Sequence, residues 1–542
     1  MIRNLGTVAG ATRGMTGILA AAATALLIST LPAPVFAQVT AFKQAVAEAA
    51  ARDADIAAYY RTHDYEAVWT EGSDTHRARR AALMAAITTA DKHGLPLARY
   101  DPTGLMATLK NAKTPRDRGL AEVEMTRVFL QYARDLQTGV LIPSRIDSSI
   151  VREVPYRDRQ TYIADFIKSE PMPFLRNLRP RTLEYNALMR EKLEMEALLS
   201  KGGWGPVVPA PSLKPDAQGN AVVALRNRLI AMGYLKRSNS MTYDKVMQEA
   251  VRAFQQDHGL NDDGVAGAAT MSEINKSVET RLKSVIVAME RERWLNKERG
   301  ARHILVNIPA FTAAVIDDGR VTFETRSVVG ANEDGRHTPE FSDTMEYIVI
   351  NPTWTVPRSI VTKEYLPSMQ RNAGAAGHID LIDGNGRVVN RGSVNFSRYN
   401  ARNFPFGMRQ KSGVRNALGL VKFIFPNKYN IYLHDTPSKN LFARDVRAFS
   451  HGCVRLADPF DFAYTLLAAQ VDDPVKFFKA QLATGRETFV HLDNELPVHL
   501  IYRTAFTTPR GHTQYRDDIY GRDAKIWDAL SKAGVALGAV QG

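Results

Sequence analysis

The sequence predicts an α+β chain of several domains, with helical domains first and a strand-rich domain after them. Its length of 542 residues exceeds what one hydrophobic core usually supports. Apolar residues recur at helical spacing from about residue 38 to residue 203. From His303 onward the pattern changes to short apolar runs separated by glycine turns, which is typical of strands.

The composition is that of an ordinary soluble globular protein, with 45% hydrophobic and 23% charged residues. The formal net charge is +13, from 70 Lys and Arg against 57 Asp and Glu. Because the basic residues are dispersed and form no nucleic-acid-binding motif, no nucleic-acid partner is expected. A solvated surface accounts for most of this charge, and attraction to an anionic envelope is a smaller contribution.

The first 37 residues have the pattern of an export signal. Arg3 and Arg13 are followed by an uncharged apolar run over residues 15–31, and residues 35–37 form a small-x-small cleavage site. An uncleaved membrane anchor is the alternative. The run is alanine-rich, however, and shorter than the roughly 20 residues that a spanning helix prefers. We therefore expect cleavage after Ala37 and an exported mature protein.

Residues 38–203 are expected to form a helical domain without chemistry of its own. One periodic segment ends at Gly139, and another, over residues 182–199, ends at Gly202 and Gly203. Glycine is a common helix stop because it adopts the left-handed conformation without strain. The proline-rich residues 204–218 that follow are predicted to be a linker.

Residues 219–276 are predicted to form a compact helical module, joined to the next domain by a helix within residues 277–300. Helical spacing is shown by Val222, Leu225, Leu229 and Met232. The module resembles the three-helix peptidoglycan-binding domain type 1 through the order Gly259-Leu260, Asp263-Gly264-Val265, Gly267 and Thr270. A packing module without a ligand is the alternative, because the apolar stripe forms a core in either case.

Cys453 is the only cysteine of the chain, so it has no partner for an intramolecular disulfide. A lone cysteine is often a small buried hydrophobe. Here it stands in Ser450-His451-Gly452-Cys453-Val454-Arg455, with His434 nineteen residues upstream, and such polar flanks make a poor core. A nearby histidine or positive field stabilises the reactive thiolate. We therefore predict that Cys453 is catalytic.

Two segments around these residues carry a family resemblance. His434-Asp435-Thr436-Pro437, followed by Ser450-His451-Gly452-Cys453-Val454-Arg455-Leu456, resembles the signature of the YkuD-type L,D-transpeptidases. That signature is a His, a spacer of variable length, and then Ser/Thr-His-Gly-Cys-x-Arg. The resemblance implies a mostly-β catalytic domain over residues 301–487. It also implies that Cys453 is the nucleophile that accepts the acyl group and that His434 is its base.

The order of domains resembles the large YcbB-like enzymes of the periplasm, which implies a periplasmic location. Their helical scaffold domain corresponds to residues 38–203, partly through Asp91-Lys92-His93-Gly94-Leu95. Their capping subdomain corresponds to an insertion at about residues 361–417, which is rich in Gly, Asn and Arg. A long insertion without apolar periodicity is typically a functional lid or disordered. Residues 488–542 are expected to be a C-terminal extension.

Residues 431–434 read as a strand, which places Tyr432 and His434 on one face. A base on a strand and a nucleophile on the next loop can be held within hydrogen-bond reach. In the family the ring of the base is oriented by a main-chain carbonyl or another neighbour. Asp435 therefore need not act as the acid of a triad.

The loop around the nucleophile supplies the other candidate residues. Main-chain N–H groups near Gly452 and Cys453 are expected to form the oxyanion hole, which needs little side-chain bulk. His451 and Ser450 are expected to shape this loop rather than to transfer protons. Arg455 is a candidate for holding a substrate carboxylate, because its planar guanidinium can bind one in a bidentate way.

Trp354 lies in Asn351-Pro352-Thr353-Trp354-Thr355-Val356-Pro357. Because two prolines make a poor strand, a fixed loop that presents Trp354 is predicted. The motif resembles the Asn-Pro-x-Trp-x-Val-Pro loop that borders the active site of YcbB-like enzymes, and a packing role is the alternative. Trp354 and Tyr432 are therefore candidates for substrate binding, together with Arg455.

The resemblance implies a particular acyl transfer. Cys453 attacks the carbonyl of the third stem-peptide residue, meso-diaminopimelate, and D-Ala departs. The side-chain amine of another stem then captures the thioester and forms a 3→3 cross-link. Acylation of Cys453 by carbapenems is implied as well. The expected partners are peptidoglycan stem peptides and glycan, and other cell-wall enzymes are candidates.

Other outcomes stay open at this point. Water could resolve the same thioester, which gives an L,D-carboxypeptidase, or a protein amine could, which attaches a protein to the wall. A non-catalytic wall-binding scaffold would use only residues 219–275, but the pair His434 and Cys453 argues against it. A zinc site built from histidine and cysteine is disfavoured, because the spacing lacks a His-x-x-x-His or Cys-x-x-Cys pair. No cofactor is expected.

Overall fold

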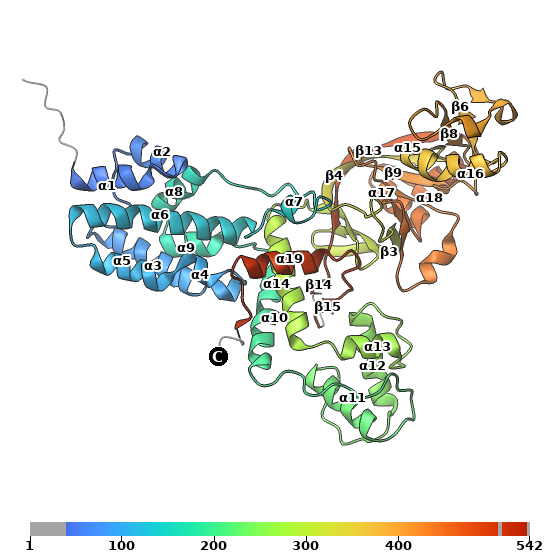
Figure 1. Ribbon diagram of the computed structural model, residues 1–542. Coiled ribbons are helices and arrows are strands. Elements are labelled where there is room, and N and C mark those ends of the chain that lie inside the picture. The colour runs from blue at the N-terminus through green and yellow to red at the C-terminus, as the bar shows by residue number, and fades with distance from the viewer. Residues whose placement is uncertain (1–39, 508–511, 539–542) are drawn as a thin grey trace, which may run out of the picture.

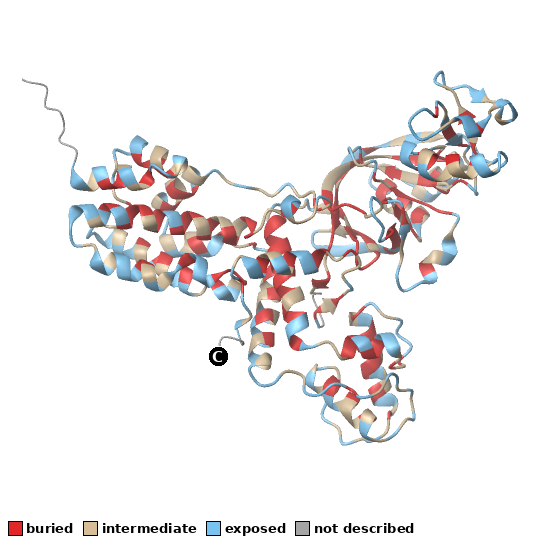
Figure 2. Cartoon of the chain, in the orientation of Figure 1, coloured by how far each residue is buried: buried red, intermediate tan, exposed pale blue. Residues whose placement is uncertain are grey.

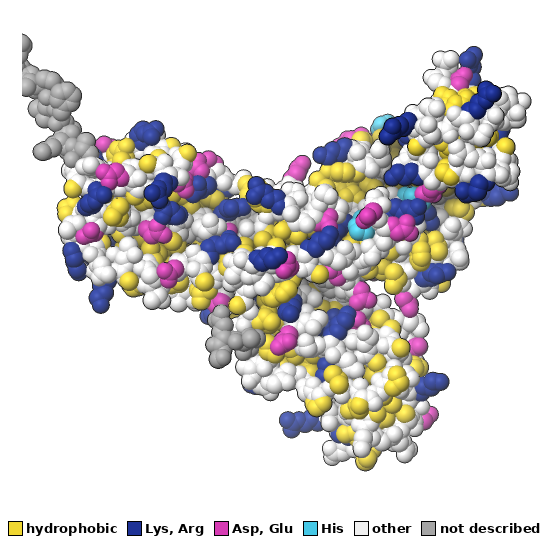
Figure 3. All heavy atoms as spheres, viewed as in Figure 1, with side chains coloured by type: hydrophobic (Ala, Val, Ile, Leu, Met, Phe, Trp, Pro, Cys, Tyr) yellow, Lys and Arg dark blue, Asp and Glu magenta, His cyan; other side chains and the backbone are white. Residues whose placement is uncertain are grey.

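The computed structural model describes residues 40–507 and 512–538, and the predicted export signal lies outside them. Figure 1 shows an N-terminal lobe of helices, a sheet with a smaller lobe at its far end, and a helical module beneath their junction. None of the described helices is long and apolar enough to cross a membrane. Lys and Arg side chains are scattered over the visible face in Figure 3.

Helices account for the regular structure of the N-terminal lobe, as predicted. The longest, α6, starts at a capping box formed by Thr114 and ends where Gly139 takes a φ of +94°. Trp69, Phe129 and Phe166 pack their rings together in the core. The helices are α1 (Ala41–Ala50), α2 (Ala54–Thr62), α3 (Asp74–Thr88), η1 (Ala90–His93), α4 (Leu97–Tyr100), α5 (Pro102–Asn111), α6 (Pro115–Thr138), α7 (Pro143–Ile146), α8 (Arg159–Lys168), α9 (Pro171–Asn177) and α10 (Leu183–Leu199).

The helical module contains α11 (Asn220–Ala231), α12 (Lys245–Asp257) and α13 (Ala268–Ile274). The predicted linker over residues 204–218 is packed against this module. Val208 of this segment is buried in the core of the module, and Leu213 forms a backbone bridge with Ala266. The apolar residues between the prolines therefore hold the segment in place.

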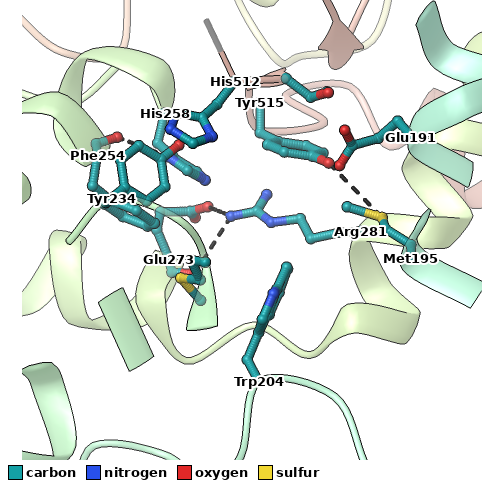
Figure 4. Close-up of a pocket in the computed structure, with 12 residues that line it drawn as sticks. Glu191, Met195, Trp204, Tyr234, Phe254, His258, Glu273, Arg281, His512 and Tyr515 are labelled. Atoms are coloured by element: carbon teal, nitrogen blue, oxygen red, sulfur yellow. Dashed lines mark hydrogen bonds and ion pairs between the residues drawn. The ribbon is translucent and has the colours of Figure 1, made fainter. Parts of the chain in front are cut away.

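The module is docked on α14 (Val278–Trp294) and on the C-terminal part of the chain. Arg281 of α14 forms an ion pair with Glu273 of the module at 2.6 Å, and both side chains are buried. The Arg281 guanidinium also lies 4.4 Å from the ring centre of Tyr515. Figure 4 shows these groups around a small cavity, which is also lined by Glu191, Trp204, Tyr234, Phe254, His258 and His512. The module thus has a buried interface with the rest of the chain.

A nine-stranded sheet forms the centre of the strand-rich lobe, in the order β11-β3-β12-β10-β9-β4-β13-β1-β2. Figure 2 shows that most of its residues are buried. The short strands β10 and β12 run parallel in its middle. The strands are β1 (Arg302–Asn307), β2 (Thr312–Asp317), β3 (Arg320–Gly330), β4 (Phe341–Ile350), β9 (Val421–Ile424), β10 (Leu433–His434), β11 (Ala448–Ser450), β12 (Val454–Leu456) and β13 (Thr488–Ile501), with η5 (Lys439–Ala443), α17 (Pro459–Leu467) and α18 (Pro474–Ala483) alongside.

The sheet extends beyond the boundary at residue 487 that the sequence suggests. Strand β13 pairs antiparallel with β4 and parallel with β1, so residues 488–501 belong to the sheet and not to a C-terminal extension. A register shift between His491 and Leu496 takes up the polar middle of this strand. This interruption, together with Pro497 just after it, makes the strand difficult to recognise in the sequence.

The capping insertion forms an ordered unit. A four-stranded sheet in the order β5-β8-β6-β7 is covered by short helices, and the unit has its own core around Leu366, Phe396 and Met408. Trp354 belongs to a short strand that pairs with Gln410, not to the predicted loop. The elements are β5 (Trp354–Thr355), α15 (Arg358–Ile360), η2 (Val361–Tyr365), α16 (Leu366–Arg371), β6 (Asp380–Ile382), β7 (Val388–Val389), η3 (Arg391–Ser393), η4 (Phe396–Arg398) and β8 (Gly407–Gln410).

The last part of the chain runs between the lobes as β14 (Ala505–Phe506), β15 (Gln514–Tyr515) and α19 (Arg522–Lys532). A buried network of charges ties α19 to α14 and to the start of β4. Arg291 pairs with Glu340 at 2.7 Å and with Asp523 at 2.9 Å, and Arg522 pairs with Glu340 at 3.1 Å. This network fixes the catalytic sheet against the helical lobe.

Candidate active site

Cys453 lies in a tight turn between β11 and β12. Gly452 takes a φ of +115° there, and a Cβ at this position would lie 3.1 Å from Ile431. The Ser450 hydroxyl donates to the Cys453 carbonyl at 2.5 Å and accepts from the Gly452 N–H at 3.1 Å. These bonds close the turn and hold the cysteine in place.

The parallel pairing of β10 with β12 brings the candidate residues together. Leu433 pairs with Val454, and both side chains are buried in the core. Because side chains alternate along a strand, the residues on either side of them share the opposite face. That face carries Tyr432, His434, Cys453 and Arg455. The strand is shorter than predicted, since only residues 433–434 are paired as β10.

The thiol of Cys453 is half-buried and donates to the Asn430 carbonyl at 3.4 Å. The main-chain N–H and the hydroxyl of Tyr432 lie against the thiol and favour its ionised form. Burial nevertheless raises the pKa of the Cys453 thiol to about 11. The thiol is therefore neutral at pH 7 in this arrangement, and among the described residues no hydrogen bond joins it to His434.

His434 is a buried, neutral imidazole. Burial lowers its pKa to about 3, and the positive charge of Arg455 adds to this effect. Its Nδ1 lies within hydrogen-bond reach of the Asp435 carbonyl, and the Leu418 carbonyl also lies against the ring. One ring nitrogen of the neutral imidazole can therefore accept a proton.

The carboxylate of Asp435 does not face the imidazole. It accepts hydrogen bonds from the main-chain N–H groups of Leu420 and Thr436 at 2.9 Å and 2.7 Å, and it pairs with Lys439 at 2.7 Å. The site therefore lacks the carboxylate of a serine-protease triad, and main-chain carbonyls orient the histidine.

Arg455 lies opposite His434 in the register of β10 and β12. Its Nε is buried and has no hydrogen-bond partner among the described residues. A buried, unpaired guanidinium N–H is costly, so this group is suited to a ligand that supplies an oxygen. A carboxylate would match both the charge and the geometry of the guanidinium.

Trp354 of the capping unit reaches the site through Tyr432. Its indole lies against the Tyr432 hydroxyl, which in turn lies against the thiol. Burial raises the pKa of Tyr432 above its ordinary value, so the hydroxyl stays protonated. Trp354 also packs against the core of the capping unit, which is the packing role considered for it.

His451 points away from the thiol and toward the capping unit. Its Nε2 lies 2.6 Å from the carboxylate of Glu364, which Arg336 also binds at 2.8 Å. Glu364 belongs to η2, so this cluster links the nucleophile loop to the capping unit. The structure thus separates the two histidines: His434 lies on the face of Cys453, and His451 lies in the contact with the cap.

Two neighbours of the site were not singled out from the sequence. Asn430 supplies the carbonyl beside the thiol and takes a φ of +54°, which asparagine tolerates better than most residues. Gly419 leaves room for Asp435, because a Cβ there would lie 2.2 Å from its carboxylate. Among the described residues, no group of three or more His, Cys, Asp or Glu side chains is arranged to hold a metal ion.

Three family models match separate parts of the chain. Residues 301–491 match "L,D-transpeptidase catalytic domain", residues 54–191 match "Scaffold domain", and residues 218–274 match "Putative peptidoglycan binding domain". A Haemophilus influenzae protein named "Putative L,D-transpeptidase" is 32% identical over 237 residues. The aligned part is 42% of this chain and 47% of that relative, so it spans about half of the relative's length.

Solved L,D-transpeptidase structures from Xylanimonas cellulosilytica and Stackebrandtia nassauensis are similar at 15% and 16% identity. Each match covers 55% of this chain, with 100% and 97% of the solved chains and TM-scores of 0.16 and 0.22. At such TM-scores the assignment depends on the family models. The chain therefore contains three segments that match, in order, a scaffold domain, a putative peptidoglycan-binding domain and an L,D-transpeptidase catalytic domain of the YkuD type.

Proposed function

We propose that this protein forms 3→3 cross-links between peptidoglycan stem peptides through a thioester on Cys453. The observation that carries the proposal is the shared sheet face of Tyr432, His434, Cys453 and Arg455 within the domain that matches the transpeptidase family. This face combines a thiol, a neutral base and a cation with a free N–H. These are the groups that thiol-based acyl transfer to and from a charged peptide requires.

The first half-reaction forms the thioester. The sulfur of Cys453 attacks the carbonyl carbon of meso-diaminopimelate, the third residue of the stem, while His434 accepts the proton of the thiol. The C–N bond to D-Ala then breaks, and the imidazolium returns the proton to the departing amine. Arg455 binds a carboxylate of the stem and orients the carbonyl for attack.

The second half-reaction transfers the acyl group to another stem. The side-chain amine of that stem attacks the thioester, His434 takes a proton from the amine, and the C–S bond breaks. The sulfur leaves with this proton, which restores the neutral thiol. The product contains a new amide between two diaminopimelate residues, and the enzyme is unchanged.

The ionisation of the site favours proton transfer at the moment of attack. Burial holds the pKa of the thiol above and that of the imidazole below its ordinary value, so a separated thiolate–imidazolium pair is unfavourable before substrate binds. A carboxylate bound to Arg455 would offset its positive charge and raise the pKa of His434. Substrate binding would thus strengthen the base in the complex where it is needed.

The oxyanion of each tetrahedral intermediate is placed at the main-chain N–H of Cys453. The neighbouring N–H of Gly452 is bound to the Ser450 hydroxyl and is not free for this role. The Cys453 N–H has no partner among the described residues. The expected oxyanion hole is therefore centred on Cys453 itself.

The match of the helical module to a peptidoglycan-binding domain also supports peptidoglycan as the substrate. We propose that it holds the enzyme on the cell wall of the periplasm, which raises the local concentration of stem peptides at the site. The expected export signal at residues 1–37 fits this location. Chemistry and wall binding would then be divided between two parts of one chain.

Mass spectrometry of muropeptides tests the proposed function. Purified protein is incubated with isolated cell wall, and Cys453→Ser is incubated in parallel as the matched control. The proposal predicts 3→3 linked dimers and free D-Ala from the wild type and neither from the variant. Tripeptides without dimers would instead show a carboxypeptidase, and the absence of any new product would overturn acyl transfer.

A further inference from the structure

Thr338 lies behind the nucleophile loop and belongs to none of the recognised motifs. It is fully buried on the connection between β3 and β4. Its hydroxyl donates to the Gly452 carbonyl at 2.7 Å and accepts from the Gly330 N–H at 2.9 Å. One side chain thus joins the end of a central strand to the residue before Cys453.

The hydrogen bond to Gly452 has a consequence for the next peptide group. In a planar trans peptide the carbonyl and the N–H point in opposite directions. The carbonyl of Gly452 and the N–H of Cys453 belong to the same peptide unit. By holding this carbonyl, Thr338 sets the direction of the Cys453 N–H, which is the expected oxyanion donor.

Two residues from the C-terminal segment hold Thr338 in turn. The Tyr520 hydroxyl donates to the Gly330 carbonyl at 2.6 Å, and Arg522 donates to the Thr338 carbonyl at 2.9 Å. Both side chains are buried, and Arg522 is also paired with Glu340. The C-terminal segment, which was predicted from the sequence to be an extension, therefore reaches the back of the active site.

The close packing leaves little freedom in this arrangement. A Cβ on Gly330 would lie 1.9 Å from the Arg336 carbonyl, so the strand end and the connecting loop touch through their backbones. Gly452 adopts a φ of +115°, a backbone conformation that residues other than glycine rarely adopt. The turn that presents Cys453 is thus held by Ser450 from within and by Thr338 from behind.

We propose that Thr338, supported by Tyr520 and Arg522, is a positioning residue that directs the main-chain N–H of Cys453 toward the oxyanion formed during acyl transfer. The inference rests on the proposed function for the identity of the acyl donor, but the geometry applies to any carbonyl that Cys453 attacks. Because the oxyanion exists only in the transition state and the intermediate, the effect belongs to kcat and not to substrate binding.

Alkylation separates this role from a general loosening of the loop. Iodoacetamide reacts with the thiol by displacement at carbon and develops no oxyanion on a carbonyl bound by the Cys453 N–H. A variant that only misdirects this N–H loses acyl transfer but keeps its alkylation rate. A variant that disorders the loop changes both reactions.

Thr338→Val removes the hydroxyl at nearly constant volume, and Thr338→Ser keeps it. We expect Thr338→Val to lower kcat for a soluble stem peptide by about 10²-fold, close to the loss seen for an oxyanion-hole donor. KM and the alkylation rate should stay within about twofold, and Thr338→Ser should recover most of kcat. Tyr520→Phe should give a smaller loss of kcat of the same kind.

The same variants are compared in acylation by a carbapenem, which also passes through a tetrahedral intermediate. If wild type reacts with the carbapenem but transfers no stem peptide, the proposed function fails while the comparison of Thr338 variants remains valid. The positioning role is overturned if Thr338→Val keeps kcat within about twofold of wild type. It is also overturned if alkylation falls as much as acylation, or if Thr338→Ser does not recover activity.

Discussion

His434 and Arg455 face each other across the parallel pairing of β10 and β12. The guanidinium adds to burial in lowering the pKa of the imidazole to about 3. The same guanidinium opposes burial at Cys453 by favouring the thiolate. One cation that acts on both base and nucleophile therefore couples the ionisation of both groups to whatever binds it.

Replacement of Arg455 by Gln should weaken the binding of stem peptides that carry a free carboxylate. Loss of a charge-assisted bidentate contact is typically worth 1.5–3 kcal/mol, so KM should rise by about 10- to 100-fold. Arg455→Lys is the matched control, because it keeps the charge and loses the planar fork. Steady-state kinetics with a stem peptide and with its amidated counterpart measure the effect. Equal losses for both peptides would show that Arg455 does not bind the carboxylate.

His434→Ala should reduce thiol reactivity near neutral pH far more than His451→Ala. A positioned base typically contributes about 10²- to 10⁴-fold. The deficit should shrink as pH rises, because the thiol ionises without help only toward its pKa of about 11. The measurement is the rate of alkylation by iodoacetamide as a function of pH for wild type and both variants.

The direction of this pH dependence follows from the lowered pKa of the His434 imidazole and the raised pKa of the Cys453 thiol. The imidazole, with its pKa of about 3, stays neutral and able to accept a proton throughout the range from pH 5 to pH 10. Wild-type alkylation should therefore keep its base-assisted component across that range, whereas the His434→Ala rate should rise about tenfold per pH unit. If His451→Ala showed a pH-dependent loss of alkylation rate and His434→Ala showed none, then His451 would be the base and His434 would only support the structure of the site.

The docking of the helical module should depend on Arg281. Arg281→Met removes one partner of a buried ion pair and leaves Glu273 paired with Lys276 alone, so the change should cost less than the 3–5 kcal/mol typical of a buried charge without any partner. We expect faster hydrogen exchange over residues 514–517, where the C-terminal segment meets the module. Lys283→Met on the same helix is the control, since Lys283 lies near Trp527, away from this interface. Unchanged exchange in Arg281→Met would mean that other contacts hold the module.

The sequence contained most of the information about the candidate site, because its residues lie in two short segments. His434 and Cys453 could be singled out from residue type and spacing, and the strand period correctly placed Tyr432 beside His434. The ionisation of these groups could not be predicted in the same way. It depends on burial and on the pairing of Arg455 with His434, which only the folded sheet brings about.

The residues that support the site could not be identified from the sequence for a similar reason. Thr338 and Tyr520 are ordinary residues in their local context, and the bonds of Thr338 to Gly452 and of Tyr520 to Gly330 each span more than a hundred positions. Strand β13 was missed because a register shift and a proline break its alternation. The capping insertion has a core of its own, but its short elements leave no periodic pattern to read.

The proposed reaction requires that Cys453 becomes covalently acylated. The most direct test is the intact mass of the full-length mature protein after incubation with a carbapenem or a stem tetrapeptide, for wild type and Cys453→Ala. We predict that wild type gains the mass of one acyl group on Cys453, and that the folded variant gains none and still binds isolated cell wall. Acylation of the folded Cys453→Ala variant, or an active wild type that never carries an adduct on Cys453, would contradict acyl transfer through a thioester on Cys453.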